Sequence, residues 1–132
     1  MDNCIKLIYE YSVLRYVPDL ERGEFINIGL LMMCKKMKWI QTEIQINEPR
    51  ILNLTKKSNL DILRKQSSVF ENTDLPSKEL PVEEKYRWMA AVKSAIIQTS
   101  PSHPGILILK DGSKAVDCLE AKFKDLFKRL VI

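Results

Sequence analysis

The fold is decided by residues 11–34, YSVLRYVPDLERGEFINIGLLMMC, in which two apolar runs flank a short charged turn. The first run continues a segment, residues 5–17, whose apolar side chains recur with the period of two that is typical of a β-strand. Between the runs, residues 18–23 begin with Pro-Asp and end with Gly, which are residue types that form turns. The second run therefore returns antiparallel to the first, and the stretch predicts a β-hairpin.

Three residues interrupt these apolar strands: Arg15, Asn27 and Gly29. A buried guanidinium or amide group costs desolvation free energy, and a glycine within a strand costs conformational entropy, so each needs an internal partner or a ligand. Because strand side chains alternate, Asn27 and Gly29 are predicted to share one face. There the gap at Gly29 would be filled by a ring such as Tyr9 or Tyr11, or by a ligand. The hairpin is therefore the first place to look for a site.

A third strand is predicted over residues 39–46, where isoleucines alternate with polar residues, and it completes a three-stranded meander. We expect helices that begin near Asn59, Pro81 and Ser113, and short β-prone runs within residues 94–100 and 105–109. Because strands come first and helices later, the sequence predicts an α+β fold. In it an antiparallel β-sheet, made of the N-terminal meander and one or two later strands, is packed on one face by about three helices. The length fits a single domain, 1–132.

The composition is that of a globular protein, with 45% hydrophobic and 29% charged residues. No apolar run approaches the roughly 20 residues that span a bilayer, and no secretory signal is recognisable, so we expect a cytoplasmic protein without a membrane partner. Cys4, Cys34 and Cys118 are far apart in apolar surroundings, which favours free thiols in a reducing compartment. Since His103 is the only histidine and no phosphate-cradling glycine loop is present, we expect no metal and no cofactor.

The formal net charge of +4 invites a nucleic-acid interpretation. The cations are scattered, however, and one local cluster, Lys35, Lys36 and Lys38, lies at the turn after the second strand. Tyrosine and tryptophan residues are not interleaved with these lysines as a base-stacking surface would require. We therefore interpret the charges as solvated surface, which needs no ligand.

His103 lies in the segment QTSPSHPG, residues 98–105, which is rich in residues that fix the backbone or offer hydroxyl groups. Histidine is a common general acid or base in enzymes. A lone histidine in a loop is usually exposed and inert, but in an enzyme His103 would be the expected acid or base. No serine lies in a strand-to-helix elbow and each cysteine lies in apolar sequence, so neither nucleophile is predicted.

Four stretches together resemble the DUF3037 family, a group of bacterial proteins of unassigned function: residues 11–29, Tyr86-Arg-Trp, residues 97–105 and the closing Leu126-Phe-Lys-Arg-Leu-Val. The similarity covers nearly the whole chain. It implies association with proteins that carry a HipA-like kinase fold, which would make this chain a binding or accessory module. One departure is Val92-Lys93-Ser94, where the family pattern more often has Pro-Arg-Ser, so any role of that cation must use the point charge of Lys93.

The polar residues noted above fall mostly inside the family-like stretches. We expect the turn after the first strand, the helix that carries Arg87, and the 98–105 loop to converge into one polar cleft. Its arginines would favour an anionic ligand or an acidic segment of a partner, because guanidinium groups pair with carboxylate or phosphate oxygens. The other hypothesis is an internal hydrogen-bond network that pins the hairpin to the helices. The candidate binding residues are Arg15, Arg22, Asn27, Arg87, Trp88, Lys93, Gln98 and His103.

Three hypotheses of function follow. The leading one is a non-catalytic binding or accessory module that recognises a protein partner through its sheet edge or its polar, arginine-containing face. The alternative is an enzyme acting on a phosphorylated or nucleotide substrate, with His103 as acid or base and Arg15, Arg22 and Arg87 holding the anion. The second alternative is a nucleic-acid-associated factor.

Overall fold

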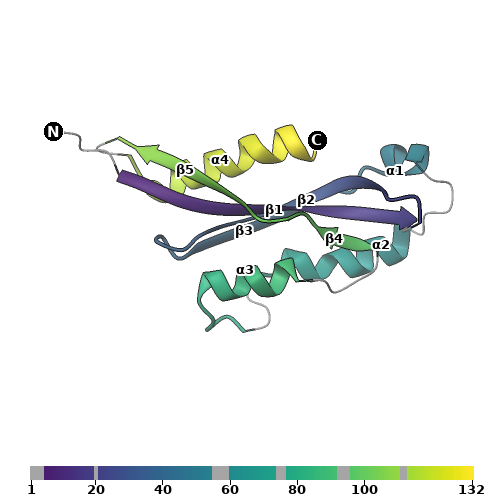
Figure 1. The fold of residues 1–132 in the computed structure, drawn as a ribbon, viewed down its shortest axis with the longest axis horizontal. Coiled ribbons are helices and arrows are strands. Elements are labelled where there is room, and N and C mark those ends of the chain that lie inside the picture. The colour runs from purple at the N-terminus through teal and green to yellow at the C-terminus, as the bar shows by residue number, and fades with distance from the viewer. Residues whose placement is uncertain (1–4, 20, 55–59, 74–76, 92–95, 111–112) are drawn as a thin grey trace.

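The computed structural model describes residues 5–19, 21–54, 60–73, 77–91, 96–110 and 113–132 (Figure 1). In chain order the elements are β1 (Ile5–Asp19), β2 (Glu24–Cys34), β3 (Trp39–Ile44), α1 (Glu48–Leu54), α2 (Leu60–Ser67), the 3-10 helix η1 (Ser68–Glu71), α3 (Val82–Ala90), β4 (Ile97–Thr99), β5 (His103–Leu109) and α4 (Ala115–Leu130).

The five strands form one antiparallel sheet in which β3, β2 and β1 are neighbours in that order. The other edge of β1 is shared by two short strands: β5 pairs with residues 5–11 and β4 with residues 14–16. At their junction the backbone amide of Val13 donates to the hydroxyl of Ser100, and the backbone amide of Ser100 donates to the carbonyl of Val13. The predicted hairpin, the meander and the α+β class are confirmed, and both predicted β-prone runs join the sheet.

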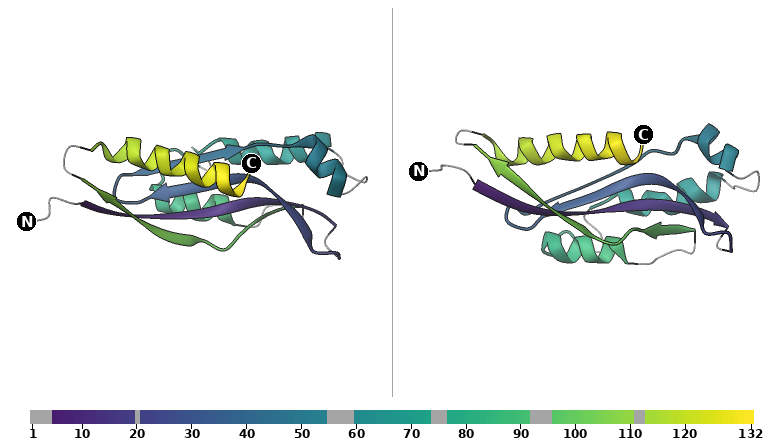
Figure 2. Two further views of the ribbon diagram at one scale, coloured as in Figure 1. Left: turned by 90° about the horizontal axis from the view of Figure 1, so that it is seen from above. Right: turned by 45° about the horizontal axis from the view of Figure 1, so that its top comes forward.

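The helices lie on both faces of this sheet (Figures 1 and 2). On one face Leu14, Leu31 and Met33 pack against α1, α2 and α3, and on the other Val13 and Leu30 pack against α4. We expected the helices on a single face, and α4 departs from that expectation. The physical reason is that every residue of β2 from 28 to 34 is buried, so both faces of the central strands must be covered.

The helix ends follow the expected signals only in part. Pro81 directly precedes α3, and α4 buries Leu119, Phe123 and Leu126 at helical spacing, as predicted. The N-cap of α4 is Lys114, not Ser113, and it makes no side-chain capping bond. The predicted cap at residue 59 lies outside the described residues, and the short α1 was not predicted.

Two further observations concern the cysteines and the apolar character of the helices. Cys34 is a buried free thiol and Cys118 is a partly buried one, whereas Cys4 lies outside the described residues. Among the helices of the described ranges, none combines the length and the apolar character needed to cross a bilayer.

Candidate functional site

A row of polar residues crosses the sheet on the face that α4 covers. Arg15 of β1 lies directly opposite Asn27 of β2 and Gln98 of β4, and opposite residues of neighbouring strands point to the same face. The amide nitrogen of Asn27 donates to the carbonyl of Leu130, 2.9 Å away, at the C-terminal end of α4. The guanidinium carbon of Arg15 lies 4.3 Å from the ring centroid of Phe25. The row therefore ties the hairpin to the end of α4.

Two buried polar atoms in this row have no hydrogen-bond partner within the described residues: Nε of Arg15 and Oδ1 of Asn27. One is a donor and the other is an acceptor, and they belong to residues that face each other across two strands. The two atoms do not bond to each other, so this row is not a closed internal hydrogen-bond network among the described residues.

The predicted face of Gly29 is wrong. A register shift follows Leu14: this residue pairs with Gly29, whereas Arg15 pairs with Asn27, which leaves Ile28 as an extra residue in β2. The extra residue reverses the alternation, because side chains change face at each step along a strand. Asn27 therefore points to the α4 face, and Gly29 lies on the opposite face with Leu14.

The gap at Gly29 is filled by its strand neighbours. A Cβ atom at Gly29 would lie 2.8 Å from the carbonyl oxygen of Glu43 and 3.0 Å from Cδ1 of Leu14, so no ligand has room there. We expected an aromatic ring to pack at Gly29, but the ring packs against another glycine. A Cβ atom at Gly105 of β5 would overlap the ring of Tyr9, which lies opposite on β1.

His103 is the first residue of β5 and is exposed. It lies opposite Tyr11, and the two ring centroids are 5.3 Å apart. Arg15 follows four residues later on β1, which places it about 13 Å away along the strand. Its guanidinium turns toward Phe25 of β2, on the side of β1 away from β5. The imidazole and the guanidinium thus share a face of the sheet without sharing a binding site.

The remaining arginines lie elsewhere. Arg22 belongs to the exposed turn between β1 and β2, where it forms a 2.7 Å ion pair with Glu24. Arg87 belongs to α3, on the face opposite Arg15 and His103, and Trp88 packs partly buried against the core on that same face. The expected convergence of all three segments is therefore wrong, because the sheet separates Arg87 and Trp88 from Arg15 and His103. Among their described residues, only α3 and the 98–105 segment meet, through Tyr86 with Ser102 and through Arg87 with Pro104. Lys93 lies outside the described residues.

A hydrogen-bond chain, buried at Ser12 and Tyr86, joins three segments that are far apart in the sequence. The hydroxyl of Tyr86 in α3 lies 2.7 Å from that of Ser12 in β1 and 2.7 Å from that of Ser102, just before β5. Burial raises the pKa of Tyr86, which keeps its hydroxyl protonated. Sequence reasoning missed this chain, although a serine amid the apolar residues of β1 was a signal for it. It is an internal network of the kind that we weighed, built from other residues.

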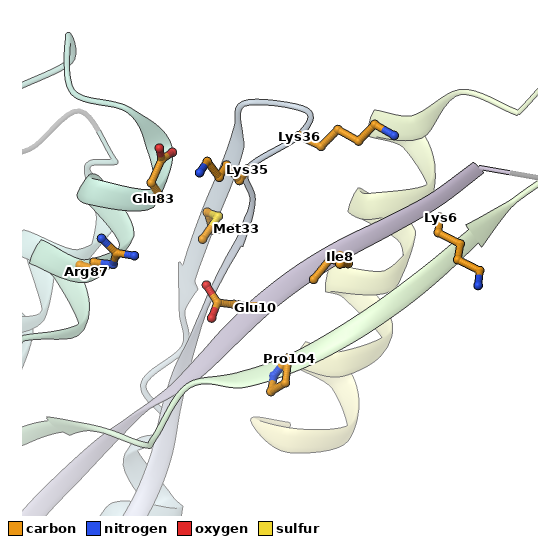
Figure 3. Close-up of a pocket in the computed structure, with 9 residues that line it drawn as sticks. All are labelled: Lys6, Ile8, Glu10, Met33, Lys35, Lys36, Glu83, Arg87 and Pro104. Atoms are coloured by element: carbon orange, nitrogen blue, oxygen red, sulfur yellow. The ribbon is translucent and has the colours of Figure 1, made fainter.

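Beside this chain, a groove of about 710 Å³ opens on the α3 side of the sheet (Figure 3). Its walls come from α3, from the paired strands β1 and β5, and from the end of β2 with the turn that follows. Apolar side chains alternate with charged ones along these walls. The lining residues are Lys6, Ile8, Glu10, Met33, Lys35, Lys36, Glu83, Arg87 and Pro104.

The apolar floor of the groove continues onto an open part of the sheet. Ile8 and Ile106 lie opposite each other on β1 and β5, and each is 64% exposed. Ile108 follows on the same face of β5 and is 59% exposed. The alternate residues Leu107 and Leu109 point to the other face and belong to the hydrophobic cluster that α4 covers. The continuously apolar sequence of β5 was the available signal, since only one of its two faces is covered by a helix.

The charges around this floor are unbalanced. Four cations, Lys6, Lys35, Lys36 and Arg87, stand against two carboxylates, Glu10 and Glu83. Within the described ranges none of the four cations forms an ion pair. In the same part of the chain, no group of three or more histidine, cysteine, aspartate or glutamate residues could hold a metal ion. The groove thus offers an apolar surface with a cationic rim.

Comparison with known proteins identifies a family without an assigned activity. The family model described as a protein of unknown function, DUF3037, matches residues 11–131. No curated protein and no solved structure shows a significant match. The matched range contains the hydrogen-bond chain and most of the groove, so both belong to the part of the chain that the family model describes.

Proposed function

Because this chain belongs to the DUF3037 family, whose description names no activity, we propose from its own geometry that it is a non-catalytic module that binds a protein partner. The observation that supports this proposal most is the open face of β1 and β5, where Ile8, Ile106 and Ile108 are exposed together beside the groove. Single exposed isoleucines are common on protein surfaces, but a contiguous patch with a polar rim is typical of an interaction site.

The size of the patch sets the scale of binding. Full burial of one isoleucine contributes about 1.5–3 kcal/mol, and these three are about 60% exposed, so covering them contributes roughly 3–5 kcal/mol. A micromolar complex needs about 8 kcal/mol, after the entropic cost of association has been met. The rim of the groove must therefore contribute as well, and it would select among partners.

The enzyme hypothesis has less support. It requires three arginines to hold one anion near His103, and these lie at a turn, on the α4 face and on the α3 face. Nucleic-acid binding would use Lys35 and Lys36, but the described residues that line the groove beside them include isoleucine and methionine and no aromatic side chain for base stacking. We propose that the partner is a protein with a HipA-like kinase fold, as the family resemblance implies. We also propose a cytoplasmic location, where free thiols stay reduced.

The test is site-specific photocrosslinking in the cells from which the chain comes. A photoreactive phenylalanine analogue replaces Ile106 at the edge of the patch, and a matched variant carries it at Leu52, which is 47% exposed on α1. We expect a discrete protein adduct from position 106 and none from position 52, with both variants retaining the wild-type circular dichroism spectrum. No adduct at position 106, or the same adducts from both positions, would refute the proposal.

A further inference from the structure

We infer that the occupant of the groove is an amphipathic α-helix of the partner, with apolar residues on one face and acidic residues along both borders of that face. This inference rests on the proposed function and specifies its ligand. It follows from the width of the open surface and from the charges that border it.

The width favours a helix over a strand. The exposed part of the floor consists of Ile106 and Ile108 on β5 and Ile8 on β1, whereas Met33 on β2 already packs in the core. Because β1 lies one strand spacing, about 5 Å, inside the edge strand β5, a strand added to the free edge of β5 would leave Ile8 uncovered. A helix with its side chains is 10–12 Å in diameter and would lie across both strands.

The spacing along the strands also suits a helix. Ile106 and Ile108 are two residues apart on β5, which is about 7 Å, and Ile8 lies about 5 Å across from Ile106. Apolar residues three and four positions apart on a helix are separated by about 5–6 Å, so one stripe of two to three turns matches the patch. The neighbouring helix α3 packs on the same sheet face in this manner, through Tyr86 and Met89.

The rim determines the charge of the helix. Arg87 borders the groove from α3, Lys35 and Lys36 border it from the turn after β2, and Lys6 lies at its far side on β1 (Figure 3). With four cations against two carboxylates, a second copy of the same surface would bring an excess of like charge together. An acidic helix would supply the missing anions, and charges in direct contact lie well within the Debye length of about 8 Å.

The experiment is a selection from a displayed library of random 16-residue peptides against the 132-residue chain. Bound peptides are then measured against three variants: Ile106→Ser in the patch, Arg87→Glu in the rim, and Ile132→Ser as a matched control at an exposed isoleucine of the C-terminus. We expect peptides that lose at least tenfold in affinity with Ile106→Ser and with Arg87→Glu, and that bind the Ile132→Ser variant as they bind the wild type.

Their sequences and conformation decide between the hypotheses. The inference expects acidic peptides with apolar residues at positions i, i+3 or i+4, and i+7, helical circular dichroism on binding, and weaker binding as salt rises. Replacing one peptide glutamate by arginine should restore affinity for the Arg87→Glu variant. Peptides that depend on Ile106 but are basic, or alternate with a period of two, would overturn the helix and leave the proposed function standing. If no peptide depends on Ile106, both fail.

Discussion

Removing the hydroxyl of Tyr86 should destabilise the protein far more than the loss of one oxygen atom suggests. This hydroxyl bonds both Ser12 and Ser102, each at 2.7 Å, and so connects α3, β1 and the segment before β5. In Tyr86→Phe the two serine hydroxyls differ in whether water can replace the lost partner. Ser102 is exposed and can bond water, whereas Ser12 is fully buried and loses the one side-chain partner that it has within the described residues.

The magnitude follows from that difference. An unsatisfied buried hydroxyl costs about 1–3 kcal/mol, and an exposed one costs close to nothing. We therefore expect Tyr86→Phe to lower the free energy of unfolding by about 2 kcal/mol, which corresponds to a fall in Tm of about 6 °C for a domain of this size. Ser12→Ala should cost about 1 kcal/mol, because the hydroxyl of Tyr86 keeps its bond to Ser102.

The assay is urea denaturation followed by tryptophan fluorescence, with the double variant completing a thermodynamic cycle. Ser12→Ala combined with Tyr86→Phe should cost less than the sum of the single changes, because no buried hydroxyl is then left unpaired. Tyr11→Phe is the matched control: its hydroxyl makes no hydrogen bond within the described residues, so its effect should stay within about 0.5 kcal/mol. An effect of Tyr86→Phe as small as that of the control, or strict additivity, would refute the reasoning.

The same hydroxyl predicts a pH dependence. Burial raises the pKa of Tyr86 above its usual 10.0. The contribution of the protonated hydroxyl to the free energy of unfolding is therefore fully present below pH 10 and is lost as the pH rises through the folded-state pKa. In urea titrations, the loss of stability at alkaline pH should be smaller for Tyr86→Phe than for the wild type. Gly29→Ala should destabilise by about 1–3 kcal/mol, because the new methyl group would lie 2.8 Å from the carbonyl oxygen of Glu43; an unchanged urea midpoint would contradict that crowding. Asn27→Ala should cost about 1 kcal/mol and speed amide hydrogen exchange in the last turn of α4, where the carbonyl of Leu130 loses its donor; unchanged exchange there would show that this bond does not hold the helix end.

Local patterns predicted much of the fold. The alternation in β1, the turn residues before β2 and the apolar spacing of α4 depend only on near neighbours in the chain, and these elements formed as expected. The candidate site could be predicted less well. Arg15 and Asn27 were identified as residues that need partners and Gln98 as a candidate binding residue, and the structure brings the three into one row. Arg87 was grouped with them, yet it lies on the other side of the sheet.

The failures share one physical cause. A single extra residue, Ile28, reverses the alternation of side chains in β2. No residue type in residues 24–34 predicts this bulge, because a bulge is specified by the pairing of two strands. The open isoleucine face has the same origin. The sequence of β5 shows that both of its faces are apolar, but which face receives a helix depends on where the later chain packs.

By itself, therefore, the amino-acid sequence determined the strands, most helices, the α+β class and the absence of a recognisable catalytic motif, since each of these depends on periodicity or on residue types close together in the chain. Only the tertiary structure decided which faces of the sheet are covered, joined Tyr86 to Ser12, and left Ile8 and Ile106 open beside the cationic rim. These features require contacts between segments up to about a hundred residues apart, and burial, not local pattern, selects among the ways of making them.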